Sequence, residues 1–160
     1  MRHIPHGADP RVRPQPPGDN RWQRGRVVDA LYLADSEETV WAEWYRHLAE
    51  HGLPPVQGLP RDLWRYRVPQ AEVADLTTRA KLARVGLSAP RPGRGDWPAY
   101  QHVGETLWRE GWTGLLTRSA ARPSGLILCL FTRDGALPAR PSGRPRIVRQ
   151  PPAPPTGMRT

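Results

Sequence analysis

Proline and glycine recur so often in this chain that helices and strands are expected only in the segments between their dense groups. Twenty Pro and 15 Gly occur among 160 residues, with dense groups at 1–20, 88–96 and 132–160. This content stays below the level expected of a wholly disordered chain. The seven Trp indicate a packed core, because disordered chains are poor in aromatic residues. A chain of this length buries one core, so we expect one folded unit of short elements.

Apolar patterning between these breakers predicts four strands and three helices. The strands are expected at 27–34, 63–68, 115–116 and 126–131, and the helices at 37–50, 75–85 and 98–110. Pro98 suits the first turn of the last helix, and Gly111 suits its end. The elements alternate without a regular βαβ rhythm. We therefore predict an α+β fold with a small mixed sheet and flanking helices.

The helix at 37–50 has the clearest pattern. Its apolar residues share one side at 3.6 residues per turn: Val40, Trp41, Trp44 and Leu48. Asp35, with Glu38 three residues later, forms a variant of the capping box. Asp75 is expected to cap the next helix.

The excess positive charge lies at the two ends of the chain. Six Arg face two Asp over 1–26, six Arg face one Asp over 132–160, and 12 basic residues balance 12 acidic ones over 27–131. A nucleic-acid-binding domain usually carries a basic stripe on its folded face, so this distribution argues against nucleic acid as the partner. With seven Pro and almost no apolar periodicity, 132–160 is predicted to be an extended tail outside a domain at 1–131.

The sequence contains no pattern for export, membrane insertion or metal binding. Cys129 is the single cysteine and lies in an apolar run, so we expect a buried thiol rather than a disulfide. The longest apolar run has six residues, against about 20 for a membrane helix. His3 and His6 form a lone His-x-x-His pair with no cysteine or third histidine nearby in sequence. We therefore expect a cytoplasmic protein with no metal site and no membrane contact.

Two arginines near the start are candidates for binding an anion. Arg21 stands beside Trp22, and Arg2 lies further upstream. An arginine can bind a phosphate through two parallel hydrogen bonds while a neighbouring ring packs on the ligand. The alternative is a surface arginine next to a core tryptophan.

Tyr32 and Glu43 are candidates within the predicted strand and helix. A tyrosine in an apolar strand usually belongs to the core, with its hydroxyl satisfied. Glu43 borders the apolar face of helix 37–50. It either points into a cleft or only pairs with a solvent-side Arg46.

Ser119 lies in a polar loop between two predicted strands. A serine there can bind a ligand, or it can merely cap the turn. Arg118 and Arg122 stand on either side of it, which favours an anion site.

The order and spacing of these residues resemble the RES domain family. The first block comprises Arg21-Trp-Gln-x-Gly25, Leu31-Tyr-Leu-Ala34 and a helix with Ser-x-x-Thr-x-x-x-Glu43. The second comprises Gly104-Glu-x-Leu-Trp108, Gly114-Leu-Leu, Ser119-Ala and a hydrophobic strand ending in Phe131. The resemblance covers about 1–131.

The resemblance implies an NAD-degrading enzyme with a fold like that of ADP-ribosyltransferase toxins. Many members are toxins of toxin–antitoxin pairs, so a cognate antitoxin is an expected partner. The family's arginine, glutamate and serine correspond to Arg21, Glu43 and Ser119, its tyrosine to Tyr32, and an earlier arginine to Arg2. The implied substrates are NAD+ and inorganic phosphate or water, with no cofactor.

The implied roles follow the chemistry of breaking the nicotinamide–ribose bond. Glu43 would stabilise positive charge on the ribose. Arg21 and Arg2 would hold the pyrophosphate, and Tyr32 and Trp22 would pack on the substrate. Ser119, with Arg122, would bind a phosphate group: that of NAD or the incoming nucleophile.

Two other functions stay open. The same fold could transfer ADP-ribose to a protein or a small molecule, leaving label from NAD on the acceptor. Alternatively, the basic ends could bind RNA or an acidic partner, and such binding would weaken steeply with salt.

Overall fold

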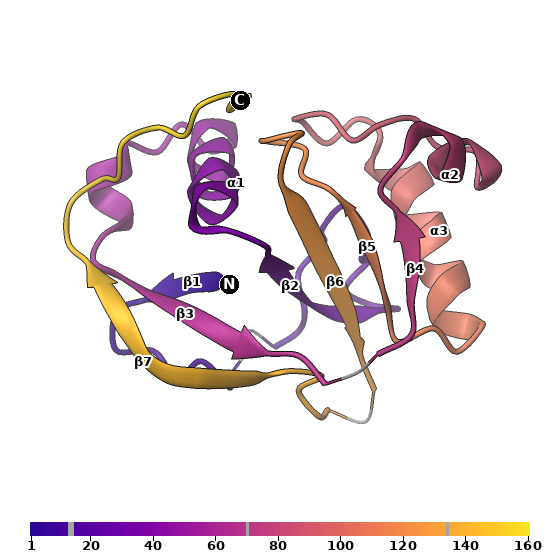
Figure 1. The fold of residues 1–160 in the computed structure, drawn as a ribbon, viewed down its shortest axis with the longest axis horizontal. Coiled ribbons are helices and arrows are strands. Elements are labelled where there is room, and N and C mark those ends of the chain that lie inside the picture. The colour runs from indigo at the N-terminus through magenta and orange to yellow at the C-terminus, as the bar shows by residue number, and fades with distance from the viewer. Residues whose placement is uncertain (13–14, 70, 134) are drawn as a thin grey trace.

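The computed structural model describes residues 1–12, 15–69, 71–133 and 135–160. Their strands form two sheets with helices packed against them (Figure 1). Both sheets are small, and the helices are not arranged in a regular βαβ series. The predicted α+β class is therefore confirmed.

One sheet has three antiparallel strands and the other has four strands. The first has the order β1–β3–β7, with β1 at Arg2–Pro5, β3 at Arg61–Arg67 and β7 at Arg140–Val148. The second has the order β2–β6–β5–β4, with β2 at Asp29–Ala34, β6 at Leu126–Thr132, β5 at Gly114–Arg118 and β4 at Val73–Leu76. In the second sheet only β4 and β5 are parallel neighbours.

The helices differ in which sheets they cover. Helix α1 (Glu37–Glu50) packs Trp41, Trp44 and Leu48 against residues of both sheets, beside the short 3-10 helix η1 (Pro55–Gly58). Helices α2 (Arg79–Arg84) and α3 (Trp97–Arg109) pack against the second sheet. A third cluster of buried leucines from β2 and β6 lies against Tyr66 of β3 and joins the two sheets.

The predicted helix at 37–50 is confirmed, but its cap is not Asp35. The side chain of Ser36 accepts a hydrogen bond from the Thr39 N–H at 3.2 Å and caps the helix. Glu37 and Glu38 follow in the first turn, where negative charge favours the positive end of the helix dipole. The serine takes the cap because its extended backbone precedes the first helical residue.

The helix expected at 75–85 is wrong in its first half. Val73–Leu76 forms β4, which pairs with β5 and buries Ala74 and Leu76. Asp75 instead accepts hydrogen bonds from the Thr77 N–H at 2.9 Å and hydroxyl at 2.7 Å. Thr78 is the cap of α2. Pairing with a distant strand decided the structure of this segment.

Both ends of the chain contribute strands that local patterning did not predict. The Pro-rich residues 1–20, whose composition is typical of an irregular or extended segment, contain β1. The expected tail at 132–160 contains β7, which pairs with β3 along most of its length. Backbone hydrogen bonds to β3 need no apolar periodicity, and Ala139 and Val148 anchor the segment in two buried clusters.

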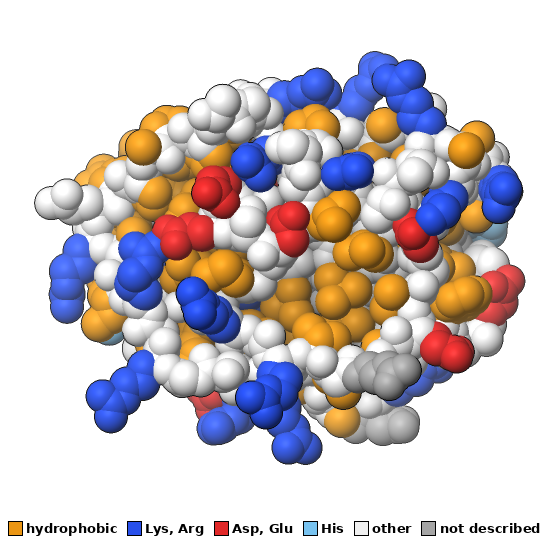
Figure 2. Space-filling view, in the orientation of Figure 1, with side chains coloured by type: hydrophobic (Ala, Val, Ile, Leu, Met, Phe, Trp, Pro, Cys, Tyr) orange, Lys and Arg blue, Asp and Glu red, His pale blue; other side chains and the backbone are white. Residues whose placement is uncertain are grey.

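The basic side chains are dispersed over the face seen in Figure 2. Apolar side chains gather in the middle of this face, and Lys and Arg lie around them and at the margin, interspersed with Asp and Glu. This arrangement differs from the continuous basic stripe typical of a nucleic-acid-binding face. Within the described residues, no helix has the length and apolar character needed to cross a membrane.

Candidate functional site

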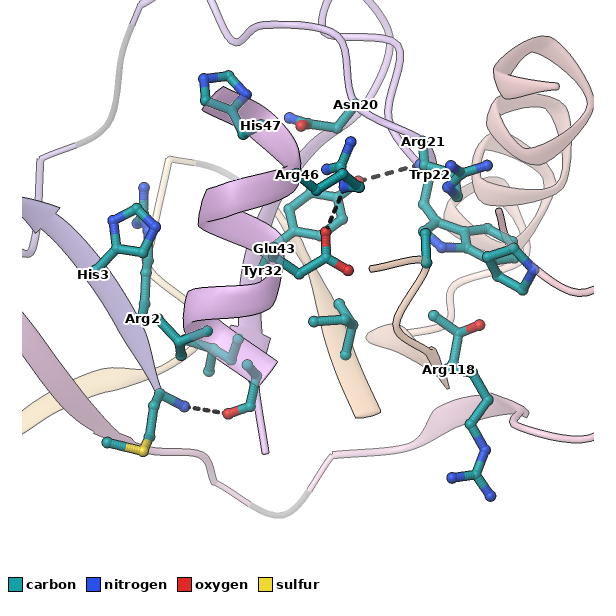
Figure 3. Close-up of a pocket in the computed structure, with 18 of the residues that line it drawn as sticks. Arg2, His3, Asn20, Arg21, Trp22, Tyr32, Glu43, Arg46, His47 and Arg118 are labelled. Carbon is teal, nitrogen blue, oxygen red and sulfur yellow. Dashed lines mark hydrogen bonds and ion pairs between the residues drawn. The ribbon is translucent and has the colours of Figure 1, made fainter. Parts of the chain in front are cut away.

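A cavity of about 400 Å³ lies between α1, the ends of β1 and β2, and the segment that leads into α3. This volume is within the usual range for small-molecule sites. Among the predicted site residues, five line it: Arg2, Arg21, Trp22, Tyr32 and Glu43. Segments far apart in sequence therefore meet at one place, as Figure 3 shows.

Glu43 lies in the wall of this cavity and is held on both carboxylate oxygens. Its Oε1 accepts the Ser119 hydroxyl at 2.6 Å and the Ala121 N–H at 3.4 Å. Its Oε2 accepts the Arg46 Nε–H at 2.9 Å. The side chain is 23% exposed. Glu43 thus presents a fixed negative charge that is still open to the cavity.

Ser119 lies behind Glu43 rather than in the cavity wall. It follows β5 and is 1% exposed. Its hydroxyl donates to Glu43 and accepts the Arg122 N–H at 2.9 Å, so the geometry makes it a support for the carboxylate. The guanidinium of Arg122 donates a hydrogen bond of 3.5 Å to Thr39 Oγ1 at the start of α1. Neither Ser119 nor Arg122 is among the described residues that line the cavity.

Arg46 was expected on the solvent side of the helix, and the structure corrects this. Its side chain is 15% exposed, lines the cavity and bridges Glu43 and Glu50. Burial lowers the pKa of Arg46, but the two carboxylates outweigh burial and raise it. The spacing of three and four residues in Glu43, Arg46 and Glu50 is the sequence signal that predicts this bridge.

Arg21 is buried and connects two loops. Its guanidinium pairs with Asp96 Oδ1 at 2.6 Å and donates to the backbone carbonyls of Arg91 and Gly93. It also lies 5.0 Å from the centre of the Tyr100 ring. Arg21 therefore fixes the wall formed by the segment before α3, and Asp96 balances its charge.

Trp22 and Tyr32 belong to the core and to the cavity wall at the same time. Trp22 is 2% exposed and meets the edge of Tyr100 at 4.9 Å between ring centres. The Tyr32 hydroxyl accepts the Trp22 N–H at 3.3 Å. Burial, followed by the neighbouring Cys129, raises the pKa of Tyr32 well above its ordinary value.

Cys129 is a fully buried thiol, as predicted. Burial raises its pKa to about 12, although a hydrogen bond with Tyr32 acts in the opposite direction. The thiol therefore stays protonated and unreactive at neutral pH.

His3 and Arg61 line the cavity but were not predicted for the site. The Arg61 Nε–H donates to His3 Nδ1 at 2.7 Å. The His3 ring stacks on Trp41, with 5.5 Å between centres and 12° between planes. Their role depends on the pairing of β1 with β3, which no local sequence pattern shows.

The two histidines of the His-x-x-His pattern have separate partners. His3 accepts from Arg61, whereas His6 Nδ1 lies 2.7 Å from Asp62 Oδ1. Within the described residues, no group of three or more His, Cys, Asp or Glu is placed to hold a metal ion.

Comparison with known proteins agrees with this architecture. The comparison with curated proteins gives no match. Among solved structures, the chain is similar to a chain of the M. tuberculosis MbcT–MbcA toxin–antitoxin complex, with a TM-score of 0.67 and 22% identity over 88% of this chain and 79% of the other. The RES domain family matches residues 2–150. This match over nearly the whole length shows that the chain belongs to the RES domain family.

Proposed function

We propose that this protein cleaves the nicotinamide–ribose bond of NAD+, as a phosphorylase or a glycohydrolase. The observation that carries the proposal is Glu43, a carboxylate held by Ser119 and Arg46 and open to a cavity lined by aromatic and basic residues. Membership of the RES domain family supports it. Such a site suits a substrate with a cationic reacting centre and anionic phosphates.

The carboxylate of Glu43 supplies what the bond cleavage requires. As the bond from ribose C1′ to the pyridinium nitrogen lengthens, its electron pair passes to the ring and positive charge builds on the ribose. A fixed carboxylate stabilises that charge. Nicotinamide leaves as a neutral molecule, so no residue has to protonate it.

The second half of the reaction adds an oxygen nucleophile to C1′. In phosphorolysis a phosphate oxygen forms the new bond, and the product is ADP-ribose phosphorylated at that carbon. In hydrolysis water adds and releases one proton to solvent. Because Ser119 and Arg46 hold Glu43 in place, the carboxylate does not have to reorganise while charge develops.

The proposal predicts that Glu43→Gln abolishes turnover with little change in fold. Removal of the negative charge should lower NAD consumption at least about 100-fold, the effect typical of losing an electrostatic contribution to the transition state. Purified protein would be incubated with NAD, with and without phosphate, and the products identified by mass spectrometry. Glu72→Gln is the matched control, since Glu72 is exposed and lies outside the cavity lining.

The products separate the alternatives. A phosphorylated ADP-ribose that requires phosphate identifies a phosphorylase, and free ADP-ribose in both conditions identifies a hydrolase. Label retained on a macromolecule identifies an ADP-ribosyltransferase instead. Wild-type turnover by a folded Glu43→Gln protein contradicts the assignment of Glu43.

A role as the toxin of a toxin–antitoxin pair is part of the proposal. The M. tuberculosis protein that shares the fold is described in a complex with an antitoxin. For this chain, the same two variants expressed in bacterial cells test the role. Wild-type protein and Glu72→Gln should deplete NAD and arrest growth, whereas Glu43→Gln should do neither.

A further inference from the structure

The part of the cavity beside β1 and β3 carries concentrated positive charge. Arg61 and Arg2 supply this charge from the paired strands β3 and β1, and His3 and His47 line the cavity beside them. Among the described residues that line the cavity, Glu43 is the single acidic one, and both its oxygens already accept hydrogen bonds.

Arg61 is half-buried without a carboxylate partner among the described residues. Its Nε–H donates to His3 Nδ1 at 2.7 Å, and one Nη1–H donates to the Gly58 carbonyl at 3.3 Å. Burial, followed by the charge of Arg2, lowers the pKa of Arg61. A guanidinium has five N–H groups, so these two contacts orient it and leave further donors for a ligand.

His3 has the properties of a residue that positions Arg61. Burial, and then the positive charges of Arg61, Arg2 and His47, lower the pKa of His3 to about 3. The ring is therefore neutral at physiological pH, and Nδ1 can accept the Arg61 hydrogen bond. Stacking on Trp41 fixes the orientation of the ring.

Desolvated cations in proteins are normally paired with an anion. A cation at a cavity with a fixed orientation and no carboxylate partner therefore points to an anionic ligand. We propose that Arg61, held by His3, binds a phosphate group at the β1–β3 end of the cavity.

The choice of phosphate rests on the proposed function, because NAD cleavage offers two phosphate sources. One is free inorganic phosphate acting as the nucleophile, and the other is the pyrophosphate of the dinucleotide. Both present oxygens that a guanidinium binds through paired hydrogen bonds. Arg21 is already neutralised by Asp96, so Arg61 is the better placed of the two to bind a phosphate.

Equilibrium binding tests the proposal without turnover. Inorganic phosphate and ADP-ribose would each be titrated by calorimetry into the full-length protein at constant ionic strength. Arg61→Gln should weaken binding of at least one of them about tenfold or more, as expected for losing a charged hydrogen-bond donor. Arg65→Gln is the control, because Arg65 lies exposed on the same strand outside the cavity lining.

The pattern of loss identifies the source. Weaker binding of inorganic phosphate alone assigns the site to the free anion, and weaker binding of ADP-ribose alone assigns it to the dinucleotide. Unchanged binding of both ligands by folded Arg61→Gln overturns the site. If wild-type protein binds phosphate through Arg61 but consumes no NAD, the proposed function fails while the anion site stands.

Stability provides a second readout. Arg61→Gln removes the charge that binds phosphate, so the increase in melting temperature on adding phosphate should disappear. A purely structural Arg61 would lower the melting temperature in both conditions and leave that increase unchanged. Should Arg61→Gln fail to fold, Arg61→Met in the same titrations decides: it keeps an unbranched stem but has neither the charge nor a hydrogen-bond donor, and wild-type binding by it would overturn the proposal.

Discussion

Ser119 and Glu43 are 76 residues apart in sequence, yet one hydrogen bond of 2.6 Å joins their side chains. Ser119 is buried behind the carboxylate, and its hydroxyl also accepts the Arg122 N–H. The serine therefore fixes the position of Glu43. A direct role for Ser119 in binding phosphate, implied by the resemblance to the family, makes a different kinetic prediction.

Ser119→Ala separates the two roles through the split between kcat and KM. A positioning role predicts that kcat falls about tenfold to a hundredfold, because a misplaced carboxylate stabilises the transition state less, while KM for phosphate stays the same. Steady-state kinetics with varied phosphate measures both. A large rise in KM for phosphate with unchanged kcat would instead support direct binding. Ser124→Ala is the control, since Ser124 is an exposed serine of the same loop.

At the scale of single residues, the sequence predicted which residues carry the chemistry better than it predicted which residues contact one another. Glu43 and Ser119 were singled out through their types and the family resemblance, and both lie at the site. His3 and Arg61 were not, because their proximity requires β1 to pair with β3. The pairing of Arg21 with Asp96 could not be predicted for the same reason, because the two residues are 75 positions apart in sequence and form no local pattern.

Among the helices, α3 is packed against the segment that carries Arg21 and Trp22. A Cβ at Gly104 would lie 2.1 Å from the Trp22 carbonyl oxygen, a backbone atom that cannot rotate away. Gln101 on the same helix donates to the carbonyls of Asn20 and Gln23. The glycine thus permits the close approach that sets one wall of the cavity.

Gly104→Ala is expected to destabilise the protein, although alanine is usually more favourable than glycine inside a helix. In an exposed helix interior this change stabilises by about 1 kcal/mol. Here the added methyl group forces α3 away from Trp22, and overpacking of this kind costs about 1–3 kcal/mol. Urea unfolding measures the change in free energy. Gly95→Ala, with no atom near its added Cβ, should change it little, and equal effects in the two variants would contradict the packing argument.

Elements with their own periodicity or breakers were predicted well. The bounds of α1 are as expected, and α3 ends just before Gly111, whose φ of 91° suits glycine. The first half of the 75–85 prediction failed because pairing of β4 with β5 overrode a plausible cap at Asp75. Local signals therefore placed the helices, and tertiary pairing decided the short strands.

At the scale of the whole molecule, the first sheet joins the two ends of the chain. Its central strand, β3, is flanked by β1 from the N-terminal end and by β7 from the C-terminal part. From its composition, 132–160 was predicted to lie outside the domain. The residues of β7 are mostly polar and the strand is held by backbone hydrogen bonds to β3, so no apolar pattern in the sequence marks it. Val148 nevertheless packs in the same cluster as Trp41 and Trp44 of α1, the helix that carries Glu43.

Two truncations test whether β7 is integral to the fold. A chain ending at residue 131 loses the ladder between β3 and β7, at about 1 kcal/mol per hydrogen bond, together with the buried Val148 and Ala139. Against a typical total stability of about 5–15 kcal/mol, this loss should abolish cooperative thermal unfolding. A chain ending at residue 150 keeps β7 and loses only the segment that contacts Tyr45 and Ala121, so it should still unfold cooperatively. Calorimetry of both proteins tests whether β7 is required for the fold. A cooperative transition for 1–131 would show that β3 is stable as an edge strand. It would also show that β7 is dispensable for holding α1 and the cavity together.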